Sequence, residues 1–260
     1  VKAWSRADID DLFQLRALLE GYSAARASTR ISLIQLDKIE ASLSQMNDML
    51  ASSRPSIEKA DRFLEFNQVF HTTVWFKEPR SQKAVPWHQD ATYFGLSPFE
   101  HVTAWVALTP STEEMGCVQI LPGSQVEGQL RHADKPDPNL MLSRGQTLTK
   151  EIDEHGAVNL IMRPGDVSFH HTLAIHRSRP NNTDQPRIGI GISYIPTRVR
   201  HVGETRLSAT LVRGTDRYGH FDLEPELGEE KSDAAAAVHA DSIGRFHKAS
   251  ESIPEMGLVH

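Results

Sequence analysis

The stretch Trp87-His88-Gln89-Asp90 stands between two runs of apolar residues that favour β-strands. His88 and Asp90 are two residues apart, so in a strand both side chains would leave the same face and could converge on one ion. An imidazole and a carboxylate are only half of a metal site. The stretch therefore predicts a metal centre on a β-rich fold, provided that the chain supplies a second histidine.

The second histidine is predicted to be His176, which closes the apolar run Leu173-Ala174-Ile175. At a strand end of this kind, inward side chains meet the mouth of a barrel. Two histidines and one carboxylate on one face, with the other positions left to water, make the facial triad of non-heme Fe(II) oxygenases. Six of the 13 histidines lie in polar surroundings and are predicted to be surface residues: His132, His155, His201, His220, His239 and His260. Two more lie in strand-like runs and are predicted to be half-buried and structural: His71 and His101.

Arg187 follows His176 by eleven residues and opens a β-rich run of small and apolar residues at 188–194. A buried arginine in such surroundings needs an anion, and its planar guanidinium matches a carboxylate with two parallel hydrogen bonds. The residues around Arg187 therefore predict an arginine that binds a carboxylate. A structural ion pair is the alternative interpretation.

Short β-rich runs separated by turns fill the middle of the chain. Many short strands with such turns predict a sandwich or jelly roll. Residues 124–154 do not fit a strand, because they are polar and broken by Pro136 and Pro138, and insertions of this length are usually functional lids or disordered. The expected strands cover 69–76, the opening motif, 101–109, 116–121, 158–162, 167–170 and 187–195.

Helical patterns flank this region. Three amphipathic helices are expected at about 8–20, 31–50 and 56–66, packed on the outside of the strands, and a closing helix at 233–249 after an acidic stretch at 221–232. The chain is thus predicted to be a single domain, 1–260. Its parts are a helical N-terminal part (about 1–66), a jelly-roll core (about 67–200) with the lid-like insertion, and a C-terminal extension (about 201–260).

The composition indicates which kinds of partner and location to expect. The formal charge of -6 at pH 7 and the pI near 6.1 argue against a nucleic-acid partner, since no basic stripe is present. Cys117 is the only cysteine, so no internal disulfide can form and a reducing, cytoplasmic location is expected. No apolar run approaches 18 residues, which predicts a chain without a membrane span. Nothing in the sequence predicts the oligomeric state.

These residues resemble the phytanoyl-CoA dioxygenase family of iron- and 2-oxoglutarate-dependent oxygenases. The resemblance covers about 67–220. It rests on the ordered set His88-x-Asp90, His176 and Arg187 and on several flanking runs: Phe76-Lys77-Glu78-Pro79, Pro86-Trp87-His88-Gln89-Asp90, Thr103-Ala104-Trp105, 116–124 and Pro164-Gly165-Asp166.

The resemblance implies a mainly β fold with a double-stranded β-helix (jelly-roll, cupin-like) core and flanking α-helices. It implies Fe(II), 2-oxoglutarate and O₂ as cofactors, with His88, Asp90 and His176 as iron ligands. Arg187 would pair with the distal carboxylate of 2-oxoglutarate. The expected cosubstrate pocket includes Lys77, Thr103, Trp105 and Gln119. Trp105 and Gln119 could equally be core and strand-surface residues. The expected substrate side includes Trp87, Gln89, Tyr93 and His170.

The insertion offers Arg131, Lys135 and Arg144, which would meet an anionic substrate group or simply be solvated. Arg144 is included among the substrate-side candidates. A small polar metabolite is preferred to a long acyl-CoA, because the insertion has few large apolar residues. The wider range of substrates includes amino acids, organophosphonates and natural-product intermediates.

The expected reaction is hydroxylation of an unactivated C–H bond, with release of succinate and CO₂. Related non-heme halogenases have a small residue where Asp90 stands, so Asp90 favours oxygen transfer. The remaining alternatives are a zinc hydrolase or manganese cupin-type enzyme with the same ligands, and a non-catalytic jelly-roll binding module. Arg187 together with Lys77 favours the oxygenase, because a hydrolase has no evident need for them.

Overall fold

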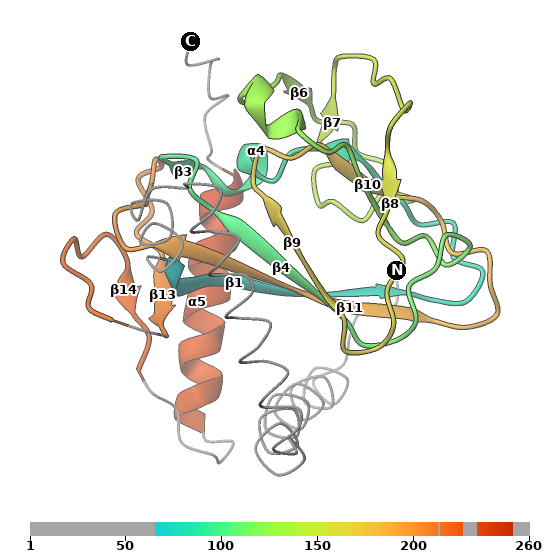
Figure 1. Cartoon of the computed structure of the whole chain (residues 1–260). Coiled ribbons are helices and arrows are strands. Elements are labelled where there is room, and N and C mark those ends of the chain that lie inside the picture. Colours follow the sequence, from blue (N-terminus) through green and yellow to red (C-terminus); the bar gives the residue numbers. More distant parts are fainter. Residues whose placement is uncertain (1–65, 213, 226–232, 252–260) are drawn as a thin grey trace, which may run out of the picture. The chain divides into compact units, whose positions relative to one another are not determined.

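The computed structural model describes residues 66–212, 214–225 and 233–251 (Figure 1). These belong to a unit that runs from Arg62 to His260, and Val1–Asp61 form a second unit outside the described residues. The helices predicted at 8–20 and 31–50 therefore lie outside the described residues, as does most of the one at 56–66. The single-domain organisation stays a prediction.

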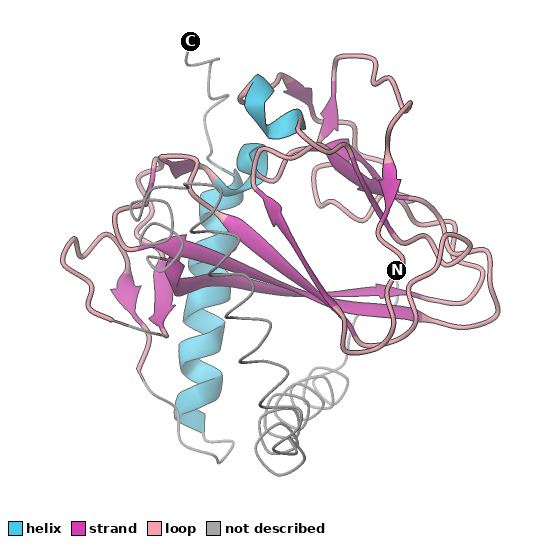
Figure 2. Cartoon of the chain, in the orientation of Figure 1, coloured by secondary structure: helices cyan, strands magenta, loops and turns pink. Residues whose placement is uncertain are grey.

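Two sheets form the framework of the described chain, and loops connect their strands (Figure 2). The larger sheet has the order β14 (Asp222–Leu223), β13 (Ser208–Leu211), β1 (Phe66–Lys77), β11 (Arg187–Pro196), β4 (Val102–Ala107) and β9 (Val167–His171), in which only the β13–β14 pair is parallel. The smaller sheet has the order β2 (Val85–His88), β10 (His176–Ser178), β5 (Val118–Ile120) and β8 (Val158–Asn159). This mainly β arrangement with two facing sheets confirms the predicted jelly-roll class.

Short elements complete the described part. Two-stranded sheets join β3 (Leu96–Ser97) to β12 (Arg200–His201) and β6 (His132–Ala133) to β7 (Thr147–Leu148). The described helices are α4 (Ala91–Phe94), the 3-10 helix η1 (Ser124–Glu127) and the long α5 (Asp233–Glu251). None of the helices in these ranges is long and apolar enough to cross a membrane.

The β1–β11 pair is the longest ladder of the larger sheet, and it runs from Phe66 opposite Pro196 to Lys77 opposite Arg187. Gly189 allows the indole of Trp105 on β4 to lie against this pair. A Cβ at Gly189 would come within 2.1 Å of Cζ2 of Trp105. The glycine is therefore required by a close approach between a ring and the backbone.

An aromatic core joins the larger sheet to α5. Phe70 on β1 packs against Phe94, Phe221 and Phe246, and Phe246 belongs to α5. Aromatic pairs of this kind stabilise by about 0.5–1.5 kcal/mol beyond the area that they bury. The closing helix predicted at 233–249 is confirmed, and it is fixed to the sheet rather than free of it.

Several boundaries differ from the sequence prediction. Phe66 begins β1, whereas the third helix was expected to extend to about this residue. The aromatic and β-branched residues of β1, and the pairing of Phe66 with Pro196 on β11, favour the strand at this residue. The core also extends past residue 200, because β13 pairs with β1 at Gln68 and Val69. The 124–154 segment is an insertion between β5 and β8, as predicted, and it contains η1 and the β6–β7 hairpin.

Candidate active site

The two histidines of the predicted triad face each other across a pair of strands. His88 ends β2 and His176 begins β10, and they are direct partners in that antiparallel pair. His176 thus opens a strand, whereas the sequence placed it at the end of one. Asp90 lies just beyond β2, at the start of α4, so the turn into α4 rather than strand alternation brings its carboxylate back to His88.

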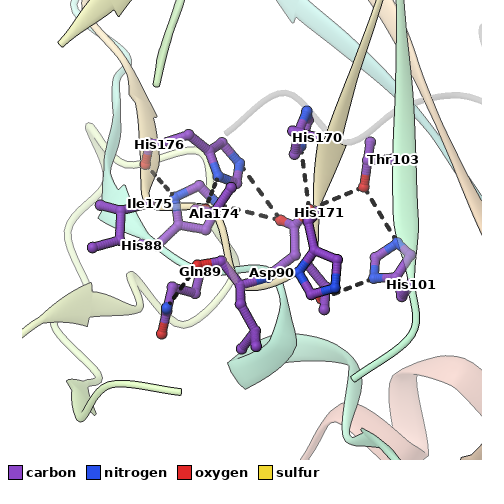
Figure 3. A network of polar contacts seen from close by, with 12 residues as sticks. His88, Gln89, Asp90, His101, Thr103, His170, His171, Ala174, Ile175 and His176 are labelled. Carbon is purple, nitrogen blue, oxygen red and sulfur yellow. Dashed lines mark hydrogen bonds and ion pairs between the residues drawn. The ribbon is translucent and has the colours of Figure 1, made fainter. Parts of the chain in front are cut away.

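The three ligand atoms form one cluster (Figure 3). Nε2 of His88 lies 3.5 Å from Oδ1 of Asp90, and Nε2 of His176 lies 3.6 Å from the same oxygen. All three atoms lie within 4.8 Å of one another. One divalent ion can therefore contact all three, and the set matches the two-histidine, one-carboxylate pattern of non-heme iron sites.

Backbone carbonyls fix the tautomers of both histidines. Nδ1 of His176 lies 2.9 Å from the carbonyl oxygen of Ala174, and Nδ1 of His88 lies 2.9 Å from that of Pro86. A carbonyl only accepts, so each Nδ1 carries the proton and donates it. Each Nε2 is then left with a lone pair toward the cluster, which is the usual arrangement around a metal-ligating histidine.

The protonation states suit a metal site. Burial lowers the pKa of His176 well below its ordinary value, and the neighbouring His88 lowers it further, so this imidazole is neutral. Burial alone would raise the pKa of the Asp90 carboxyl, but the imidazoles of His176, His170 and His88 around it hold that pKa well below its usual range. The site therefore offers an ionised carboxylate at Asp90 and a neutral imidazole at His176, as metal binding requires.

Two buried cations lie at the other end of the site. Arg187 is 1% exposed and Lys77 is 0% exposed, and no ion pair joins either of them to a carboxylate of the described residues. Both donate to the hydroxyl of Ser178, from Nη2 of Arg187 at 3.1 Å and from Nζ of Lys77 at 2.6 Å. Nε and Nη1 of Arg187 are buried, and neither has a hydrogen-bond partner among the described residues. An uncompensated buried guanidinium is costly, so this end of the site fits the carboxylate of 2-oxoglutarate.

The pKa values of these cations report the same lack of an anion. Burial, and after it the charge of Arg187, lowers the pKa of Lys77 to about 7. Burial lowers the pKa of Arg187 to about 10. A bound carboxylate would reverse both effects.

One cavity connects the metal cluster with Arg187, and both sheets contribute to its wall. Of the residues predicted for the site, Thr103, Trp105 and His170 line it together with the three metal ligands and Arg187. The guanidinium of Arg187 lies over the ring of Trp105, 5.2 Å from its centroid. Lys77 reaches the cavity wall through Ser178.

Sequence reasoning missed Ser178 and the place of His71 in the cavity wall, although His71 is half-buried as predicted. Ser178 lines the cavity, and the available signal was its position two residues after His176, which places both side chains on one face of a strand. His71 also lines the cavity, with its Nε2 2.6 Å from the hydroxyl of Thr73. Burial lowers the pKa of His71 to about 4, so it is neutral. His101, in contrast, is structural as predicted, although it is fully buried rather than half-buried.

Six of the predicted site residues do not line this cavity: Lys77, Trp87, Gln89, Tyr93, Gln119 and Arg144. The indole of Trp87 donates to Glu154 at 3.2 Å and stacks under Arg177, so it faces the opposite side of β2. The amide of Gln119 bonds Asn159 and accepts from Arg177 at 2.8 Å. The structure thus does not bring either side chain to the metal, and Gln119 is a buried strand residue rather than one on the strand surface.

The other substrate-side candidates belong to the support of the insertion. Gln89 is 1% exposed, and its amide bonds the backbone of Gly128, Leu130 and Leu173. Arg144 donates to the carbonyls of Ser250 in α5 and Thr92 in α4, and it forms an ion pair with Asp134 and lies over the ring of Tyr93. These contacts differ from the expected substrate role. Arg131 and Lys135 are exposed.

Comparison with known proteins identifies relatives of this chain. Residues 21–189 match the family profile of phytanoyl-CoA dioxygenase (PhyH). The human peroxisomal phytanoyl-CoA dioxygenase is 33% identical over 129 residues, covering 48% of this chain and 38% of that protein. The rat enzyme is 26% identical over 181 residues, covering 68% and 51%. The chain thus spans about half or less of the length of these relatives.

Among solved structures, this chain is similar to a non-heme monooxygenase. The non-heme monooxygenase ThoJ in its apo form is 32% identical, with a TM-score of 0.64, and the match covers 72% of this chain and 67% of that one. The ThoJ–Ni complex is 30% identical, with a TM-score of 0.59 and the same coverage. The chain belongs to the phytanoyl-CoA dioxygenase family, and the cofactors predicted from its sequence, Fe(II), 2-oxoglutarate and O₂, are those that this family of oxygenases uses.

Proposed function

We propose that this protein is a 2-oxoglutarate-dependent dioxygenase that hydroxylates an unactivated C–H bond of a small molecule and releases succinate and CO₂. The observation that carries the proposal is one cavity with a three-ligand metal cluster at one end and an unpaired, buried Arg187 at the other. A hydrolytic zinc site needs the cluster but not the arginine. A binding module needs neither.

The chain's own residues divide the work in this proposal. His88, Asp90 and His176 hold the metal through Nε2, Oδ1 and Nε2 and leave its other positions open. Fe(II), when bound with 2-oxoglutarate and O₂, supplies the oxidising chemistry. Arg187 and Lys77, with Ser178 between them, hold and orient the far carboxylate of the cosubstrate. At the metal end, Nε2 of His88 and of His176 face the cluster. At the other end, Nη2 of Arg187 and Nζ of Lys77 face Ser178.

The cavity wall near the metal supports a small, polar and uncharged substrate. His71 and Thr73 on β1 and Ser193 on β11 offer an imidazole and two hydroxyls there, without a formal charge. The cations in the cavity wall are Arg187 and Arg177, and Arg177 is already paired with Glu154. No lining cation is left to receive the phosphates of an acyl-CoA. A small polar metabolite or a neutral natural-product intermediate therefore fits better than a long acyl-CoA.

Asp90 argues against the halogenation alternative, because its carboxylate occupies the metal position that a halide would need. The cytoplasmic location remains the prediction made from Cys117 and the charge, and the structure adds nothing to it.

The decisive test is spectroscopic and uses no substrate. Addition of Fe(II) and 2-oxoglutarate without oxygen should give a weak visible charge-transfer band, and admission of air should release succinate. Asp90→Ala should weaken both the band and the release of succinate, because it removes one of the three metal ligands; Asp184→Ala, at an exposed carboxylate, is the matched control. Substantial turnover by Asp90→Ala would contradict the assignment of Asp90 as a ligand.

The substrate is found by a second measurement. A library of small molecules, grouped as neutral polar compounds, free carboxylates and CoA thioesters, is screened for stimulation of succinate release. Stimulation by neutral polar compounds is expected. Stimulation by CoA thioesters alone would contradict the substrate class while leaving the oxygenase intact.

A further inference from the structure

The two oxygens of Asp90 have different surroundings (Figure 3). Oδ1 faces the two histidine ligands, at 3.5 Å and 3.6 Å. Oδ2 faces away from them, toward the hydroxyl of Thr103 at 3.0 Å and Nε2 of His170 at 3.4 Å. A carboxylate with both oxygens free could bind a metal through either one or both of them. In this site only Oδ1 is left for the metal.

The direction of each hydrogen bond follows from what a carboxylate can do. An ionised carboxylate only accepts, so the Thr103 hydroxyl donates to Oδ2 of Asp90. The oxygen of Thr103 is then free to accept, and Nε2 of His101 lies 3.2 Å from it. The proton of His101 is therefore on Nε2. Its bare Nδ1 accepts from the hydroxyl of Thr172 at 3.0 Å.

His101 has a neutral ring that can both donate and accept in this series of hydrogen bonds. Burial lowers the pKa of His101 to about 4, so the ring carries a single proton at neutral pH. Its position is fixed from two sides, since its carbonyl oxygen accepts from the backbone N–H of Thr172 at 3.0 Å, and the carbonyl of Thr172 accepts from the N–H of Ala91 at 3.1 Å. Ala91 adjoins Asp90. The chain of contacts thus returns to the backbone beside the carboxylate that it orients.

His170 supplies the second donor. It is buried and lines the cavity, and its Nδ1 has no hydrogen-bond partner among the described residues. The nitrogen that faces Asp90 is Nε2, and this nitrogen must carry the proton to be stable beside a carboxylate oxygen. Two donors on one oxygen leave its lone pairs less available to a metal ion.

We propose that Thr103 and His170 fix Asp90 as a one-oxygen metal ligand, and that His101 acts through Thr103 as a positioning residue. The proposal rests on the metal site of the proposed function and adds to it the cause of its open geometry. A second oxygen of Asp90 on the metal would occupy a position that the cosubstrate or O₂ requires. Held at Oδ2, Asp90 leaves that position free.

The test uses Co(II), without 2-oxoglutarate or oxygen, and measures affinity by titration and coordination number from the intensity of the visible bands. Thr103→Val keeps the shape and removes the hydroxyl, and Thr103→Ser keeps the hydroxyl. Loss of an outer hydrogen bond of this kind lowers metal affinity by about 10- to 100-fold. That loss, with a changed Co(II) spectrum, is expected for Thr103→Val and His170→Phe but not for Thr103→Ser.

A double-mutant cycle tests the role of His101. His101→Phe should reproduce most of the loss seen in Thr103→Val, and adding it to Thr103→Val should cause no further loss, because its effect passes through the hydroxyl. An equal further loss in the double variant would overturn the role of His101. Circular dichroism checks that His101→Phe folds; if it does not, the Val and Ser variants at Thr103 and the His170 variant decide the proposal.

The outcomes separate the two levels of the argument. Binding of neither Co(II) nor Fe(II) by the native chain would contradict the proposed function. Tight binding by the native chain, with the same affinity and spectrum in Thr103→Val and His170→Phe, would overturn only the positioning of Asp90.

Discussion

Lys77 and Arg187 lie directly opposite each other in the β1–β11 pair, and both donate to the one hydroxyl of Ser178. Two like charges are thus buried side by side without a carboxylate of the described residues between them. Burial of a charge is costly unless it is paired, and the cavity next to Arg187 is where the missing anion fits. In the proposed function, this pair holds the far carboxylate of 2-oxoglutarate.

Arg187→Met should remove most of the affinity for 2-oxoglutarate and leave the metal cluster in place. Truncating one partner of a buried charge pair costs about 2–5 kcal/mol, or roughly 30-fold or more in affinity. The measurement is a 2-oxoglutarate titration of the charge-transfer band. Arg163→Met is the matched control, because the side chain of Arg163 is 89% exposed. An unchanged affinity in Arg187→Met would exclude Arg187 from the cosubstrate site.

The affinity for 2-oxoglutarate should fall as the pH rises above about 7. Burial lowers the pKa of Lys77 to about 7 in the free protein, and a bound carboxylate would raise it again. Below that pH, Lys77 is already charged and binding takes up no proton from it. Above that pH, binding must first protonate Lys77, so the dissociation constant rises by up to about tenfold per pH unit.

The groups around Lys77 do not produce this dependence themselves. Arg187 keeps its charge across this range, since its pKa is about 10, and burial raises the pKa of the Cys117 thiol, which therefore stays neutral. Lys77→Met should bind 2-oxoglutarate more weakly and with a flat profile between pH 6 and 9. A native profile without a slope in that range would contradict the role of Lys77.

Gly189→Ala should disturb the cosubstrate pocket from behind. The added Cβ would lie 2.1 Å from Cζ2 of Trp105, whose ring supports Arg187. Overpacking of this kind costs about 1–3 kcal/mol of stability, and the displaced ring should also weaken 2-oxoglutarate binding. Gly244→Ala is the control, since a Cβ there meets nothing within 4 Å and the residue lies in α5. That change should stabilise by up to about 1 kcal/mol. Equal stability of the two variants would refute this account of Gly189.

The sequence predicted the residues that meet at the metal but not how the chain brings them there. His88, Asp90, His176 and Arg187 are read from spacing and residue type, which are local properties. The turn into α4 that carries Asp90, and the start of β10 at His176, depend on strand pairing between segments far apart in the chain. Pairing of this kind leaves a weak local signal.

Some errors were avoidable. Neighbouring residues of a strand face opposite sides of the sheet. Since His88 faces the metal cavity, Trp87 was expected to face away from that cavity, as it does. The same rule applied to His176 would have found Ser178. Arg144 is different, since its partners Ser250, Thr92 and Asp134 come from three separate segments. No periodicity in the sequence encodes those contacts.

Gln89→Leu should loosen the insertion without removing a metal ligand. The amide of Gln89 donates to the carbonyls of Gly128 and Leu173 and accepts from the N–H of Leu130. Leucine is similar in size and leaves these three backbone groups without their partner. The hydrogen bond to Leu173 is buried, and an unpaired buried group costs about 1–3 kcal/mol. The backbone groups regain hydrogen bonds, with water as the partner, only if the 124–154 segment opens. Hydrogen exchange of its amides should therefore speed up by at least tenfold in Gln89→Leu, while exchange in β1 and β11 stays unchanged. Gln125→Leu, at an exposed position of the same insertion, should leave both regions as in the native protein. Equal exchange in Gln89→Leu and Gln125→Leu would show that the insertion is held by its other contacts, such as those of Arg144.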